Sequence, residues 1–389
     1  MALATSGSDI KTDLMTLRVA QIAPLFESVP PKYYGGTERV IDNLTKGLLK
    51  CGVDVTVFCS GDSTTSGNIE AVWPEALRLS RTQIRDPLAY QMRMLDMVAQ
   101  RADEFNIIHN HYDYPLLSLA RMTTTPLIST IHGRLDVPRQ DIRAVYDRFT
   151  DVPLVSISNA QRVPMPHLNW ASTIHHGMDV SRSTFFPTAG KYLAFLGRFS
   201  PEKRPDWAID IAMKSGIPLK LAAKIDEQMP EYYETKVKNR IDGKFIEYVG
   251  EITEKEKCDF LGNALALVFP IDWPEPFGLV MTEAMACGTP VLARPRGSVP
   301  EIVIDGKTGF IRESIDDLAK LAEKTAALDR AQIRKHVENN FSVERMTQEY
   351  LNVYKQLERP TNVRRMADDR RHLVHPVDSL TDRHTKDIA

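Results

Sequence analysis

Short apolar segments alternate with longer amphipathic ones along most of the chain. Segments of four to seven residues, rich in β-branched and large apolar side chains, predict strands at 17–23, 53–59, 106–111, 126–131, 153–158, 172–176, 191–197, 218–223, 244–250, 264–270, 290–294 and 309–312. Runs this uniformly apolar are typical of parallel strands that are covered by helices on both faces. The pattern therefore predicts an α/β protein.

The stretches between these strands show helical spacing. Apolar side chains recur every three or four residues from Glu38 to Cys51, which predicts a helix with one face on a sheet. Thr253 followed by Glu256 is the signature of a capping box at a helix start. A last helix is predicted at 343–357, where Tyr350 and Tyr354 share one face with other apolar residues.

The alternation runs through the chain twice, which predicts two doubly wound Rossmann-like domains with a cleft between them. Pro187 and Gly190 interrupt the pattern, and we place the boundary there. The predicted organisation is a flexible N-terminus at 1–16, a first domain at 17–186, a second domain at 187–342, a helix at 343–358 that crosses back to the first domain, and a flexible, highly charged tail at 359–389.

Composition narrows the class of protein. The chain has 389 residues and a formal net charge of -2, whereas a protein that neutralises nucleic-acid phosphates carries a basic excess. No apolar run approaches the ~18 residues that cross a bilayer, and the first residues lack a secretory signal. The four cysteines are scattered, so neither a zinc ribbon nor a disulfide framework is expected. These features favour a cytoplasmic protein.

The stretch 269–293 carries the most chemical information. A strand ends near Phe269, a proline-rich loop places Glu275, and Gly278 opens a helix that also carries Glu283. The first amides of such a helix face the cleft beyond the carboxyl edge of the sheet and can bind an anion. Both glutamates can then face one ligand, although two exposed acids on an ordinary turn are the simpler alternative.

A second candidate site lies at 195–206, again between a strand and a helix. Arg198 and Lys203 lie five residues apart around a turn, and together they can neutralise a diphosphate. The third is the pair Gly35 and Gly36 in a proline-rich loop at 30–40, which allows close approach to a phosphate. This loop lacks the glycine pattern of a nicotinamide or flavin site. Taken alone, a solvated turn remains the alternative for both stretches.

Histidines also lie at the ends of two predicted strands, at 109–111 and 175–176, and His132 follows a third. A metal site is not expected, because two imidazoles two residues apart are taken to alternate faces of the strand and no third ligand has suitable spacing. On the residues alone, all of these histidines are interpreted as structural.

These stretches together resemble the retaining glycosyltransferases of family 4, which have the GT-B fold. Glu275 and Glu283 match the family's glutamate pair with seven residues between them, and the flanking residues 276–279 and 288–291 match as well. The pattern Gly-Arg…Glu-Lys fits at 197–203, although Arg204 stands where the family often has glycine. The resemblance covers roughly residues 17–357, and the order of the loops is similar to an avilamycin-pathway subgroup.

The resemblance implies a role for each matched residue. Glu275 and His132 would contact the donor sugar near the reaction centre, Glu283 would accept hydrogen bonds from the ribose, and Arg198 and Lys203 would hold the diphosphate. The remaining implied donor contacts are the backbone of Phe277, Gly278, Leu279 and Val280, the loop carrying Ile252, and the glycines Gly35 and Gly36, while Arg134 and Asp136 would touch the acceptor.

The function implied is a retaining hexosyltransferase that moves a sugar from a UDP- or GDP-sugar to a hydroxyl of a carbohydrate, lipid-linked or small-molecule acceptor. The chain has no Asp-x-Asp motif, which other transferases use to hold a divalent ion, so no metal or cofactor is expected. A nucleotide-sugar epimerase or hydrolase and a non-catalytic nucleotide-sugar-binding protein remain alternatives. Arginines at 78, 81, 85, 93 and 101 suit either a solvated face or a weak contact with the inner face of a membrane.

Overall fold

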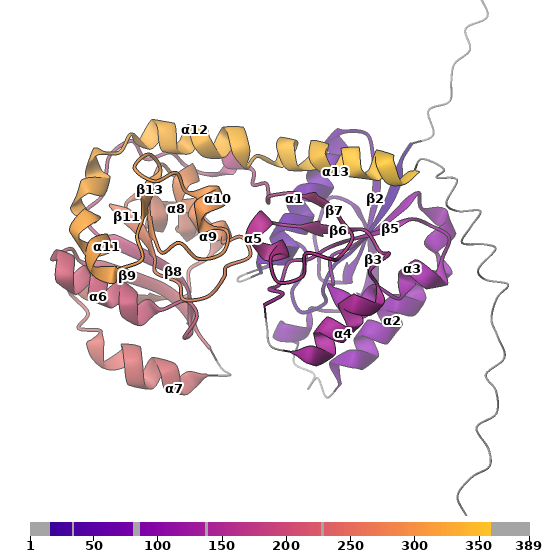
Figure 1. Ribbon diagram of the computed structural model, residues 1–389, viewed down its shortest axis with the longest axis horizontal. Helices are drawn as coiled ribbons and strands as arrows, with labels where there is room; N and C mark the ends of the chain where they lie inside the picture. The colour runs from indigo at the N-terminus through magenta and orange to yellow at the C-terminus, as the bar shows by residue number, and fades with distance from the viewer. Residues whose placement is uncertain (1–15, 33–34, 81–85, 137–138, 227–228, 359–389) are drawn as a thin grey trace, which may run out of the picture.

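Two parallel β-sheets, one from each half of the chain, form the framework of the protein (Figure 1). The structure is a computed structural model, and it describes residues 16–32, 35–80, 86–136, 139–226 and 229–358. Alternate residues of the central strands enter two different apolar cores, so each sheet is buried on both faces. This is the α/β architecture, with two Rossmann-like units, that the alternating pattern predicts.

The first sheet has the strand order β3-β2-β1-β4-β5-β6-β7. Its strands are β1 (Arg18–Ile22), β2 (Asp54–Ser60), β3 (Asn68–Trp73), β4 (Ile107–Asn110), β5 (Leu127–Thr130), β6 (Leu154–Ser156) and β7 (Trp170–Thr173). The helices of this half are α1 (Gly36–Lys50), α2 (Pro87–Gln100), α3 (Leu119–Met122), α4 (Gln140–Arg148) and α5 (Asn159–Arg162). The order reverses between β1 and β4, which creates a crevice at the carboxyl ends of these strands.

The second sheet repeats this plan, with the order β10-β9-β8-β11-β12-β13. Its strands are β8 (Leu193–Phe199), β9 (Leu219–Ile225), β10 (Ile246–Gly250), β11 (Ala266–Phe269), β12 (Val291–Ala293) and β13 (Gly309–Ile311). Its helices are α6 (Pro205–Ser215), α7 (Pro230–Tyr232), α8 (Glu254–Gly262), α9 (Leu279–Ala286), α10 (Val299–Ile302), α11 (Ile315–Leu321) and α12 (Arg330–Asn340). Here the order reverses between β8 and β11, the two strands that precede Arg198–Lys203 and Glu275.

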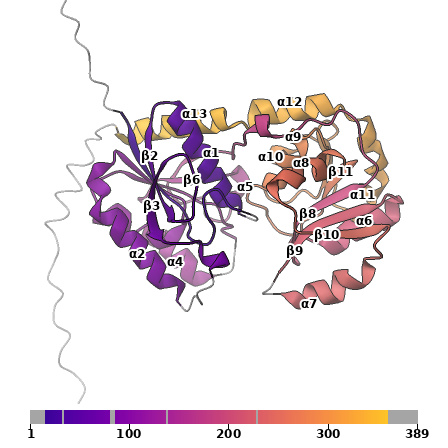
Figure 2. The same cartoon turned by 180° about the vertical axis from the view of Figure 1, so that it is seen from behind.

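The last helix, α13 (Val343–Glu358), returns to the first half of the chain. It packs against α1, and Tyr350 and Tyr354 are buried in the core on that side of the first sheet. Figure 2 shows α12 and α13 following one another along one edge of the molecule, from the second sheet to the first. The chain therefore links the two halves at 174–192 and again at α12–α13.

The structure differs from the sequence-based elements in two places. The strand β3 was not predicted, because it lies at the sheet edge, where polar and exposed residues interrupt the apolar run. The strand predicted at 172–176 begins and ends earlier, as β7, because His175 and His176 lie beyond the sheet, toward the cleft and the second half. The capping box of α8 is present as predicted: the Thr253 side chain accepts a hydrogen bond from the Glu256 amide, and the Glu256 side chain accepts one from the Thr253 amide. The predicted flexible ends lie, apart from Thr16, outside the described residues.

Candidate active site

A cleft of about 740 Å³ lies between the two halves, at the carboxyl ends of both sheets. It brings together nearly all of the residues singled out from the sequence: Gly35, Gly36, His132, Arg134, Arg198, Lys203, Ile252, Glu275, Phe277, Gly278, Leu279, Val280 and Glu283. Asp136 lines a small neighbouring pocket instead. The sequence thus predicts one contiguous site, although the roles assigned to its residues stay predictions.

The loop before α9 is fixed by contacts with the segment that follows β12. The Ser298 amide donates a hydrogen bond to the Glu275 carbonyl (2.9 Å), and the Ser298 hydroxyl donates to the Phe277 carbonyl (2.7 Å). Gly297 has a φ of 56°, and a Cβ there would lie 2.2 Å from the Glu275 carbonyl oxygen. Only glycine permits this approach, so Gly297 determines the position of Glu275.

Gly278 starts α9 in a left-handed conformation, with a φ of 80°. The first amides of any α-helix lack partners within the helix. Here the residues around the start of α9, from Phe277 to Val280, line the cleft. The positive end of the helix dipole adds to their attraction for an anion. A phosphate group is the ligand that this start of α9 suits best.

The Glu275 carboxylate is almost buried and is held by two donors. Its Oε2 atom lies 2.5 Å from Lys203 Nζ and 3.0 Å from Trp273 Nε1. The Lys203 ammonium group also lies 4.7 Å from the centre of the Trp273 ring, a distance at which the cation and the ring attract one another. The ion pair therefore fixes both side chains at the carboxyl ends of the second sheet's strands.

Arg198 lies at the end of β8 on the same wall. Its guanidinium contacts Glu202 (2.7 Å) and Asp226 (3.3 Å), so the diphosphate of a ligand would compete with these carboxylates. The φ of Arg204 is 53°, in the left-handed region that glycine adopts most easily, which agrees with the glycine that the family often has at this position. Contacts of Arg204 with Asp206 and with the Trp207 ring, 3.6 Å away, compensate for that conformation.

Glu283 lies at the other end of the cleft, where ion pairs join the two halves. Its Oε1 atom is 2.7 Å from Lys257 Nζ and 4.0 Å from Arg39 Nε, and Arg39 also pairs with Glu254. Because Arg39 comes from α1, these contacts cross the cleft. Sequence analysis missed Arg39 and Lys257, which look like ordinary charges on helix surfaces.

His132 follows β5 and belongs to a row of imidazoles in mutual contact. His132 Nε2 lies 3.0 Å from His111 Nδ1, and the His132 ring stacks on that of His176 with centroids 5.2 Å apart. Burial lowers the pKa of His132 to about 3, so the ring is neutral at physiological pH. Its Nδ1 atom is buried and has no hydrogen-bond partner within the described chain. A neutral imidazole of this kind can hydrogen-bond a sugar hydroxyl.

The expected alternation of His109 and His111 across the strand is wrong. Residues two apart on a strand share a face, and their ring centroids lie only 3.9 Å apart. His109 has a structural role, because it is hydrogen-bonded to Thr130 and to Tyr354 of α13, both at 2.7 Å. Within the described part of the chain, no three His, Cys, Asp or Glu side chains are arranged to hold a metal ion.

The predicted acceptor residues contact each other. The Arg134 guanidinium makes two hydrogen bonds of 2.6 Å to the Asp136 carboxylate and lies over the Trp273 ring, 5.0 Å from its centre. Only Arg134 of this pair reaches the cleft. Asp136 therefore orients Arg134 in this structure.

Glu38 is a buried acid in the first turn of α1 that sequence analysis used only as the start of a helix. It lines the cleft near Glu27 and Arg78, which pair with each other. Burial is the largest cause that raises its pKa, and the Glu27 charge adds to it, giving a value of about 7. The sequence offered one signal that Glu38 belongs to the site: it lies two residues after Gly36, which was already a candidate site residue.

A cleft at the carboxyl ends of two Rossmann-like units is the arrangement of the GT-B fold, in which glycosyltransferases are found. Residues 34–182 match the family model "Glycosyltransferase Family 4", and residues 179–340 match "Glycosyl transferases group 1". The two matches adjoin and cover both halves of the cleft. Both halves of the chain thus match glycosyltransferase models, and the protein belongs to the glycosyltransferases with the GT-B fold.

Relatives with known names agree with this family. The chain is 28% identical to the D-inositol 3-phosphate glycosyltransferase of Mycolicibacterium smegmatis, in an alignment 331 residues long that covers 72% of this chain and 76% of the relative. It is 25% identical to the glycogen synthase of Mycobacterium tuberculosis, in an alignment 337 residues long that covers 72% of this chain and 79% of the relative.

Solved structures share the fold. AviGT4, a glycosyltransferase of avilamycin A biosynthesis, has a TM-score of 0.67 at 23% identity, covering 89% of this chain and 99% of its own. Anabaena HepE, solved with UDP and glucose, has a TM-score of 0.69 at 17% identity, covering 87% of this chain and 100% of its own.

Across the described residues, the helices are too short or too polar to cross a membrane.

Proposed function

We propose that the protein transfers a hexosyl group from a UDP- or GDP-sugar to an acceptor hydroxyl, with retention of anomeric configuration and without a metal ion. The observation that carries this proposal is that Arg198, Lys203 and the start of α9 line one wall of the cleft, beside Glu275 and Glu283. HepE, solved in complexes with UDP and with UDP-glucose, shares the fold and supports a nucleotide-sugar donor.

Catalysis would depend mainly on stabilising the negative charge that develops on the leaving group. As the bond between the anomeric carbon and the phosphate oxygen breaks, negative charge grows on the leaving diphosphate. Arg198, Lys203 and the amides after Gly278 would stabilise that charge more in the transition state than in the ground state. These positively polarised groups are the reason why we propose a reaction that needs no divalent ion.

The groups around the sugar come from both halves of the cleft. Neutral His132 would hydrogen-bond the donor sugar and Glu275 would bind its hydroxyls, while Arg134 would contact the acceptor. Retention follows the family resemblance, in which the leaving phosphate helps to deprotonate the acceptor on the same face. With the two halves docked, water is displaced from the cleft, which limits hydrolysis of the donor.

A panel of UDP- and GDP-sugars with varied hydroxyl acceptors tests the proposal, with the released nucleoside diphosphate as the readout. We expect Glu275→Gln to lower the rate by about a hundredfold or more, because it removes the charge that holds Lys203. The matched control is Glu247→Gln, on the exposed end of an ion pair with Lys220 in the same domain. NMR of the product reports retention, and the rate in EDTA reports the need for metal. The proposal fails if no donor is turned over or if Glu275→Gln is unimpaired.

A further inference from the structure

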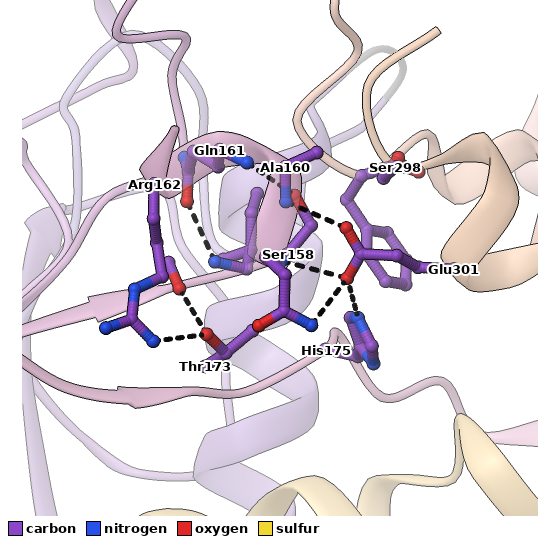
Figure 3. A network of polar contacts seen from close by, with 12 residues as sticks. Ser158, Ala160, Gln161, Arg162, Thr173, His175, Ser298 and Glu301 are labelled. Atoms are coloured by element: carbon purple, nitrogen blue, oxygen red, sulfur yellow. Dashed lines mark hydrogen bonds and ion pairs between the residues drawn. The ribbon is translucent and has the colours of Figure 1, made fainter. Parts of the chain in front are cut away.

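A single carboxylate of the second half, that of Glu301 in α10, is bound by three donors of the first half and by His175 at the start of the segment that links the halves. Its Oε1 atom accepts from the Ala160 amide (2.8 Å), and its Oε2 atom accepts from the Asn159 amide (2.8 Å) and side chain (3.1 Å) and contacts His175 Nε2 at 3.0 Å (Figure 3). The first partner segment belongs to the half that carries His132, and the second directly follows β7, the last strand of that half.

The first of these segments leads directly to His132. Gln161, in the same helical turn as Asn159 and Ala160, is buried, and its Nε2 atom donates to the carbonyls of Ile131 (2.9 Å) and Gly133 (2.7 Å). These two carbonyls lie on either side of His132 in the chain. The turn that Glu301 binds therefore holds the His132 backbone from both sides.

The second segment supports the His132 ring. His175 is bound by Glu301, and its neighbour His176 stacks on His132 with an angle of 21° between the rings. The His176 ring also contacts Phe277, with the ring centres 4.8 Å apart. Phe277 belongs to the loop that leads from Glu275 into α9. His176 is thus placed between the candidate catalytic histidine and the loop of Glu275.

The surroundings of Glu301 favour an ionised acceptor. Burial raises the pKa of a carboxyl, but hydrogen bonds from His175 and from the amides of Asn159 and Ala160 outweigh it, and the pKa of Glu301 lies below its usual value. Charge-assisted hydrogen bonds of this kind are the stronger ones. All of them form only when the two halves are docked.

We propose that Glu301 is a positioning residue for sugar transfer: by binding the segments 159–161 and 175–176, it places His132 against the donor when the domains close. This inference rests on the proposed function, because it assigns Glu301 an effect through His132. Glu301 does not line the cleft among the described residues, so it has no direct contact with a donor there.

A double-mutant cycle tests it. Glu301→Gln has the same size but places an amide group against donors, so at least part of the four contacts is lost. We expect kcat to fall about tenfold to a hundredfold, because small misplacements of a reacting group have effects of this size, while UDP affinity changes less than about threefold. In the His132→Ala background, Glu301→Gln should have almost no further effect on kcat.

Gln161→Met is the second variant, since it retains the size of the side chain and removes the bonds to the carbonyls beside His132, together with the bond that Gln161 Oε1 accepts from the Ile157 amide (2.8 Å). It should show the same kcat loss and the same lack of additivity with His132→Ala. Glu344→Gln is the matched control, because this glutamate lies on α13 with its side chain 73% exposed. Its kinetics should equal those of the wild type.

The outcomes separate the two proposals. If the wild type turns over no donor, the proposed function fails and this inference fails with it. If the wild type is active but the losses from Glu301→Gln and His132→Ala multiply, or UDP affinity falls as far as kcat, only the inference is overturned. An unchanged kcat in Glu301→Gln also overturns the inference alone.

Discussion

Lys203 Nζ and Glu275 Oε2 lie 2.5 Å apart, although 72 residues separate them in the sequence. The pair lies at the reversal of strand order in the second sheet, with Lys203 following β8 and Glu275 following β11. The side chains are 15% and 9% exposed, so neither charge is well solvated. A buried ion pair contributes little to net stability, but removal of one partner leaves the other charge uncompensated. The pair is therefore better explained by the site than by the fold.

Lys203→Met should lower kcat by about a hundredfold or more, because the developing charge on the diphosphate loses a cation. UDP binding should weaken as well, and steady-state kinetics together with calorimetry measure both effects. Lys214→Met, in an exposed pair with Asp316 in the same half, is the control and should resemble the wild type. Equal kinetics for the two variants would contradict a role for Lys203 at the diphosphate.

Gly297→Ala should displace the Glu275 loop. The added Cβ would lie 2.2 Å from the Glu275 carbonyl oxygen and 2.4 Å from its amide nitrogen, so the backbone must move. We expect a loss of stability of about 2 kcal/mol or more, together with a rate reduced about a hundredfold. Urea unfolding and donor turnover measure the two effects.

Gly306 provides the matched control for that substitution. Its φ is 72°, close to that of Gly297, but no atom lies within 4 Å of a Cβ built there. Gly306→Ala should cost only the ~1 kcal/mol of a left-handed alanine and leave turnover unchanged. If both substitutions have the same effect, the packing of Gly297 on Glu275 is unimportant.

The fold was largely predictable because its strands are buried on both faces, which makes each one a continuous apolar run. β3 shows the limit of that signal: only one face of this edge strand is covered, and Asn68, Ile69 and Ala71 are exposed. The location of the cleft was also predictable, since parallel sheets bind ligands at the carboxyl ends of the strands beside a reversal of order.

The contacts between the halves were not predictable in this way. Arg39, Lys257 and Glu301 lie on helices or turns, where charged residues are common and usually solvated. Their partners belong to other elements far along the chain, such as Asn159 for Glu301 and Glu283 for Lys257. No local spacing records such a pairing, because it depends on how the two halves dock.

Glu283→Gln should weaken nucleotide binding about tenfold, since a charge-assisted hydrogen bond to the ribose becomes a neutral one. The effect should appear mainly in the dissociation constant of UDP or GDP and not in kcat. The 2′-deoxy nucleotide is the control ligand: the wild type should discriminate against it more than Glu283→Gln does. Equal discrimination by the two proteins would place the ribose away from Glu283.

The stability of the protein should depend on pH through Glu38. Its pKa is about 7 in the folded state, against the ordinary glutamate value of 4.5, and burial is the main cause. The unfolded chain therefore loses this proton first as pH rises, and between about pH 4.5 and pH 7 the folded state binds more protons. Stability from this group is present at low pH and is lost as pH rises through the folded pKa.

Glu38→Gln should remove this dependence, because the neutral side chain pays no cost for ionisation. The variant should gain up to about 3 kcal/mol relative to the wild type between pH 5 and pH 8, from a pKa difference of 2.5 units at 1.36 kcal/mol each. Urea unfolding at both pH values measures the change, with Glu344→Gln as an exposed control. If the difference between Glu38→Gln and the wild type is the same at pH 5 and pH 8, Glu38 does not titrate near neutrality and the cleft around it must be wetter than the structure shows.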